Sequence, residues 1–90
     1  MLPSPKSPSD MTYQMVGKII SEANGKTRRN LLRRVKRVLA LAARRGYQHS
    51  QDFVAMLLLP KPSPVSVRRH TNQVLAYVSR EEWYYLMRLH

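Results

Sequence analysis

The chain has 90 residues, a hydrophobic content of 43% and a formal net charge of +11. This length suits one small domain rather than two, and the apolar content is too high for a chain that is disordered throughout. Because the sequence contains no cysteine, it excludes disulfide bridges, a thiolate nucleophile and a zinc site with cysteine ligands.

The N-terminal part is predicted to contain an arm followed by a first helix. Residues 1–9 hold three prolines among serines, which disfavours a helix and predicts a flexible arm. A helix is expected over about residues 11–23, with Asp10 as its N-cap. Asn24 and Gly25 are expected to end this helix in a left-handed conformation.

A long basic helix is predicted next, with Thr27 as its candidate N-cap and Gly46 at its end. Nine of the sixteen Lys and Arg residues lie between Lys26 and Arg45, and no Asp or Glu does. At 100° per residue, the apolar side chains gather on one side of the helix; they are Leu31, Leu32, Val35, Val38, Leu39 and Ala42. The basic side chains on the other side are Arg29, Arg33, Lys36, Arg37 and Arg44.

The next segment is predicted to hold a short apolar helix and a proline-rich connector. Ser50 is the expected N-cap of this third helix, which should stop before Pro60. The three prolines of residues 60–64 predict a stiff spacer. For residues 65–78 two alternatives stay open, since the valines favour a small β-hairpin turning near Thr71 while a helix fits the same residues.

A capping box marks the start of the last helix. Ser79 and Glu82 have the S-x-x-E spacing, so the helix should begin at Arg80, with Trp83, Leu86 and Met87 facing inward. The sequence therefore predicts a mainly α, single-domain helical bundle over residues 10–90. It would consist of a helical hairpin, a short third helix and a C-terminal helix, with a β-hairpin at 65–78 as an open alternative.

The basic helix gives the main functional hypothesis. Like charges spaced three and four residues apart repel each other, and no neighbouring acid offsets this repulsion, so an anionic partner is expected. We therefore expect a non-enzymatic protein that binds the phosphate backbone of DNA or RNA. The predicted binding residues are Arg29, Arg33, Lys36, Arg37, Arg44 and Arg45.

Two short segments resemble DNA-binding motifs. The turn at Gly46 between two helices resembles a helix-turn-helix, but the helix after it offers Gln51, an acid and then apolar residues, so base-specific reading by this helix is not expected. Residues 74–86 are similar to the start of a ribbon-helix-helix repressor, in which a strand paired across a dimer precedes a helix. No functional residue is transferred from either resemblance.

The alternative hypothesis is a small modulator of the kind used by phages and mobile elements, which would dock on an acidic surface of a host nucleic-acid-processing enzyme. Its interface would include Tyr84, Tyr85, Arg80 and Arg88, because Tyr and Arg are enriched at interface hot spots. A homodimer that pairs through apolar helices is a further alternative.

Catalysis and membrane binding receive little support from the sequence. His49, His70 and His90 lack metal-ligand spacing and there is no Gly-rich phosphate loop, so neither an enzyme nor a cofactor is expected. The longest apolar run, Phe53–Leu59, is far shorter than the ~20 residues that span a bilayer. A cytoplasmic location is therefore expected, with membrane-surface binding ranked last.

Overall fold

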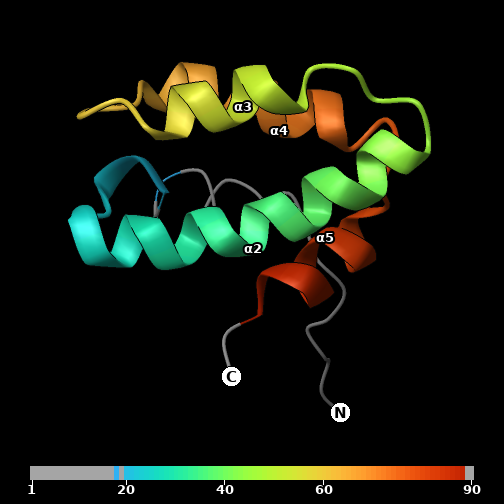
Figure 1. Cartoon of the computed structure of the whole chain (residues 1–90), viewed down its shortest axis with the longest axis horizontal. Helices are drawn as coiled ribbons and strands as arrows, with labels where there is room; N and C mark the ends of the chain where they lie inside the picture. Colours follow the sequence, from blue (N-terminus) through green and yellow to red (C-terminus); the bar gives the residue numbers. More distant parts are fainter. Residues whose placement is uncertain (1–17, 19, 89–90) are drawn as a thin grey trace, which may run out of the picture.

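The described part of the computed structural model, Lys18 and residues 20–88, is mainly helical and contains no strand. Residues 18 and 20–22 are helical. The four helices that follow are α2 (Gly25–Arg44), α3 (Ser50–Leu57), α4 (Pro64–Val74) and α5 (Arg80–Met87). In Figure 1, α3 and α4 form one layer, α2 runs beneath α3, and α5 packs on the other side of α2. The predicted arm at 1–9 and most of the predicted helix at 11–23 lie outside the described residues.

The start of α2 differs from the prediction. Asn24 is extended, with φ −88° and ψ −175°, and it is the N-cap of α2 rather than part of a left-handed cap on the preceding helix. Its carbonyl oxygen accepts the first helical hydrogen bond, from the amide of Arg28 at 2.7 Å. Gly25 is therefore the first residue of α2, and the predicted N-cap at Thr27 is wrong by one turn.

The end of α2 is the left-handed glycine turn that the sequence predicts. Gly46 has φ +115°, and its amide donates to the carbonyl of Ala43 at 3.1 Å while the amide of Tyr47 donates to Ala42 at 3.0 Å. This pair of bonds is a Schellman motif. It turns the chain so that Tyr47 enters the core.

The core lies between α2 and the three helices after it. The buried residues of α2 are the six predicted from the helical period: Leu31, Leu32, Val35, Val38, Leu39 and Ala42. They belong to one cluster with Phe53, Met56 and Leu57 of α3, Val67 and Val74 of α4, and Trp83 and Met87 of α5. The Phe53 and Trp83 rings stack with centroids 6.4 Å apart.

The β-hairpin alternative for residues 65–78 is wrong, because residues 64–74 form α4. Ser63 caps this helix by accepting from the amide of Ser66 at 3.4 Å, and Pro64 occupies the first helical position, where its missing N–H costs no bond. Val67, Thr71 and Val74 recur at helical spacing and are buried. The apolar period thus outweighs the β-propensity of the individual valines.

The structure also differs from two smaller predictions for the residues next to α4. Val74 ends a helix and is followed by a turn over residues 75–77, so the strand that the resemblance to ribbon-helix-helix repressors implies does not form. The proline segment is not a simple spacer either. Pro62 is buried and Pro64 belongs to α4.

The capping box at α5 is confirmed. The amide of Glu82 donates to Ser79 Oγ at 3.1 Å, and the amide of Ser79 donates to Glu82 Oε1 at 2.9 Å. As expected, Trp83 and Met87 are buried, while Leu86 is half-buried against the core.

Candidate nucleic-acid interface

One side of α2 forms a continuous basic surface, which we call the cationic face: Arg29, Arg33, Lys36, Arg37 and Arg44. All five side chains are exposed. Within the described residues, none of them makes a hydrogen bond or an ion pair. Because α2 carries no Asp or Glu, its positive charge is not neutralised within the helix.

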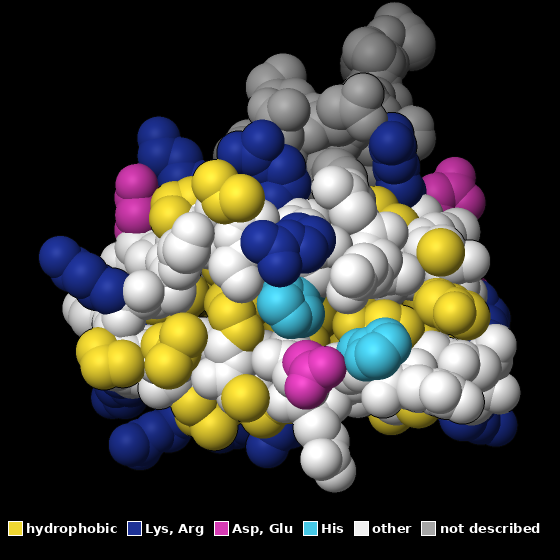
Figure 2. Space-filling view, turned by 90° about the horizontal axis from the view of Figure 1, so that it is seen from above, with side chains coloured by type: hydrophobic (Ala, Val, Ile, Leu, Met, Phe, Trp, Pro, Cys, Tyr) yellow, Lys and Arg dark blue, Asp and Glu magenta, His cyan; other side chains and the backbone are white. Residues whose placement is uncertain are grey.

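The helical period places the cationic face opposite the buried stripe. Its five residues lie within an arc of roughly 100°, and Arg29, Arg33 and Arg37 follow one another at intervals of four residues. From Arg29 to Arg44 the face extends roughly 22 Å along the helix axis, which is about the axial length of six base pairs. Figure 2, seen from the side of α3 and α4, shows Lys and Arg side chains at several separate places along its lower margin.

Lys26 is a basic residue of this surface that the sequence analysis did not include in the binding set. It is exposed in the first turn of α2, and it points in the same direction as Arg44 at 100° per residue. Its position on this side of α2 could have been predicted from the helical period. Lys26 lies three residues before Arg29 and extends the basic surface by about 4.5 Å along the helix axis.

Arg28 differs from its neighbour Arg29 because its guanidinium group is used inside the protein. Nη1 donates to the carbonyl oxygens of Leu59 at 2.6 Å and Pro60 at 3.0 Å, and Nη2 donates to that of Ala23 at 2.7 Å. These bonds join the turn before α2 to the segment after α3. Arg28 therefore holds the fold together and is not part of the cationic face.

Arg34 is also used internally. Its Nε donates to the carbonyl oxygen of Arg88 at 3.0 Å, and its Nη1 donates to that of Asn30 at 3.2 Å. This side chain fixes the end of α5 against α2.

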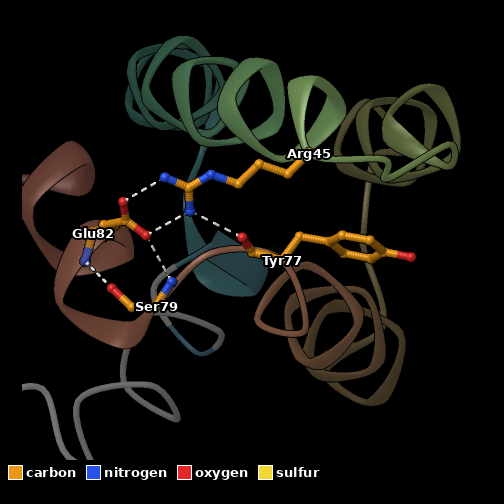
Figure 3. Close-up of polar contacts among 4 residues, drawn as sticks. All are labelled: Arg45, Tyr77, Ser79 and Glu82. Carbon is orange, nitrogen blue, oxygen red and sulfur yellow. Dashed lines mark hydrogen bonds and ion pairs between the residues drawn. The ribbon is translucent and has the colours of Figure 1, made fainter.

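Arg45, which the sequence analysis included among the binding residues, faces α5 instead. Its two terminal nitrogens each lie 2.9 Å from one carboxylate oxygen of Glu82, and Nη1 also donates to the carbonyl oxygen of Tyr77 at 3.0 Å (Figure 3). Hydrogen bonding from Arg45, followed by the bond from the Ser79 backbone, lowers the pKa of Glu82 to about 2. The carboxylate stays ionised far below neutral pH, so Arg45 keeps its partner.

The predicted interface residues of α5 lie on the surface. The side chains of Tyr84 and Tyr85 are 47% and 67% exposed, and Arg80 and Arg88 at the two ends of the helix are exposed as well. Tyr85 borders a hollow of about 350 Å³ that α5 forms with Leu41 of α2. Leu41 projects roughly 40° beyond Arg37 around α2, so Tyr85 lies beside the cationic face.

Two histidines outside α2 lie close to polar groups. At the start of α3, His49 Nδ1 lies 3.3 Å from Asp52 Oδ2, and both side chains are exposed. His70 Nδ1 lies 2.8 Å from the carbonyl oxygen of Ser66. Among the residues that the structure describes, no three His, Asp or Glu side chains are grouped so that they could hold a metal ion. No helix in this part of the chain is long and apolar enough to cross a membrane.

The fold and this surface together define a small, mainly helical protein with a basic helix face. No family model, no curated protein and no solved structure matches the chain.

Proposed function

We propose that this chain is a non-enzymatic protein that binds the phosphate backbone of nucleic acid along the cationic face of α2. One observation carries the proposal. Three of the arginines between Lys26 and Arg45 donate hydrogen bonds to groups of the protein itself: Arg28, Arg34 and Arg45. The five residues of the cationic face have no such partner among the described residues.

Phosphate groups suit this arrangement of charge. A row of cations gains affinity by releasing the counterions condensed on nucleic acid, and arginine can bind phosphate oxygens with two parallel hydrogen bonds. Contacts of this kind fix the position of the backbone and carry no direct sequence information. We therefore expect binding with little sequence preference.

The composition of α3, the helix after α2, favours contact with the phosphate backbone of nucleic acid rather than with its bases. Phe53, Met56 and Leu57 of α3 are buried in the core. The exposed residues of α3 are Gln51, Asp52 and Ala55, so the helix has no row of Arg, Asn or Lys side chains that would read base edges in a groove. The cationic face is the better docking element.

Binding to an anionic membrane surface receives less support than binding to nucleic acid. An interfacial helix inserts its apolar face into the lipid, but the apolar face of α2 is buried in the core of the protein. Inserting it would require the protein to open.

A salt titration tests the proposal. Fluorescence anisotropy with a labelled mixed-sequence duplex should give a log Kd that depends linearly on log salt, with a slope of magnitude about 4.5 for five phosphate contacts and about 3.5 for a single strand. An unrelated second duplex should bind with an affinity within a few-fold of the first. Absence of binding at low salt, or a slope near zero, would contradict the proposal.

The second candidate function is that of a protein-binding modulator that docks on an acidic partner. What favours it is an apolar groove next to the cationic face, between α2 and α3.

A further inference from the structure

An open groove of about 390 Å³ runs along the outside of the α2–α3 pair. Its lining is mainly apolar: Leu39, Ala40 and Ala43 come from α2, and Val54, Ala55 and Leu58 come from α3. Leu58 is 65% exposed. Since α3 already buries Phe53, Met56 and Leu57 on its other side, the helix presents apolar side chains to the solvent as well as to the core.

The helix that forms one wall of the groove is long enough for about two turns of a docked helix. The eight residues of α3 are about 12 Å long, which corresponds to two turns of a helix lying alongside. Three of the lining side chains are small alanines, and Leu58, which follows the last residue of α3, lines the groove as well. Helices that dock in such grooves insert apolar side chains spaced three, four and seven residues apart.

The rim of the groove is positively charged on the side of α2. Lys36 lines the groove, and Arg33 and Arg44 project within roughly 40° of Ala40 around α2. The single acid of α3, Asp52, hydrogen-bonds to His49 and projects roughly 120° away from Leu58. A partner helix in this groove would therefore meet apolar contacts at its centre and cations along one flank.

We infer that the α2–α3 groove binds an amphipathic helix of another protein, with an apolar ridge on the groove and acidic side chains facing Lys36, Arg33 and Arg44. Charge decides between this occupant and a second copy of the chain. A second copy would bring another +11 of charge against the same rim, and like charges across an interface are unfavourable. Nucleic acid presents no apolar ridge to the groove, so this inference goes beyond the proposed function, although the acidic side chains of the partner would contact Lys36, Arg33 and Arg44, which also belong to the cationic face.

A selection experiment tests the inference. The nuclease-treated full chain is used to select from a displayed library of helical peptides that have leucines at helical spacing and randomised flanking positions. The same library is then bound to A55E, which places an acid in the groove, and to A76E. Ala76 is exposed and does not line the groove, so A76E is the matched control for the change in charge.

We expect the selected peptides to be enriched in Asp and Glu along one flank. Their affinity should fall at least about ten-fold with A55E and should not change with A76E. The inference would be overturned if selection on the wild-type chain enriched no peptides relative to selection on A55E, or if the enriched peptides had neutral or basic flanks. Binding that survives A55E but is lost in the double variant R33E/R37E would assign the peptides to the cationic face alone and would also overturn it. Circular dichroism spectra that match wild type verify the folding of each variant.

Discussion

Replacing Arg33 and Arg37 with glutamate is expected to weaken nucleic-acid binding about 100-fold or more at near-physiological salt. Each substitution removes one phosphate contact and adds a repulsive charge, and the slope of log Kd against log salt should fall in magnitude by about two. The fold should be retained. Both side chains are exposed and without a partner in the described part of the chain, and a glutamate at position 33 replaces the repulsion with Arg29, four residues away, by attraction.

The matched control is the double variant R68E/R69E on α4. Both arginines are exposed, and the change in net charge is the same as for the double variant on α2. Affinity for a labelled duplex, measured by anisotropy, should be much less affected in the α4 variant. Equal losses in both variants would mean that the net charge of the protein, rather than the cationic face, determines binding.

Arg28 and Arg29 are expected to have opposite roles although they are neighbours. R28A should lower the free energy of unfolding by about 1–2 kcal/mol, because it removes hydrogen bonds from a charged group to Ala23, Leu59 and Pro60. R29A removes an exposed side chain with no partner among the described residues, so the free energy of unfolding should change by less than about 0.5 kcal/mol.

Urea denaturation of the two variants measures the difference in the free energy of unfolding. Fluorescence anisotropy, at a temperature where both variants are folded, measures their affinity for nucleic acid. R29A should bind nucleic acid more weakly than wild type, whereas folded R28A should bind it about as well. If R29A were the destabilised variant, or R28A the weaker binder, the assignment of Arg28 to the stability of the fold and of Arg29 to the cationic face would be wrong.

Local patterns in the sequence predict much of this fold. The buried stripe of α2 follows directly from the helical period, and the capping box between Ser79 and Glu82 defines the start of α5. For residues 65–78 the sequence left a β-hairpin and a helix open, because the β-propensity of the valines competes with the helical spacing of Val67, Thr71 and Val74, and the helix forms. Asn24 was predicted to end the preceding helix but caps the start of α2, because asparagine is favourable at both kinds of helix end.

The roles of the arginines depend on the tertiary structure, so the helical wheel could not separate them. Arg28 bonds to carbonyl groups that are 31 and 32 residues away along the chain, Arg34 to one that is 54 residues away, and Arg45 to a carboxylate that is 37 residues away. The sequence therefore predicted which side of α2 carries the exposed cations, but it did not show that Arg45 pairs with Glu82. The groove between α2 and α3 was also not predicted, because its two walls meet only in the folded protein.

The central claim is that the cationic face of α2 binds nucleic acid. Its most direct test is to capture the tagged protein from a lysate at near-physiological salt, with and without nuclease, and to identify what stays bound. We predict that nucleic acid is recovered with the protein, and that nuclease removes it together with any proteins that it carries. Recovery of no nucleic acid, with one protein retained in stoichiometric amount after nuclease treatment, would contradict the claim.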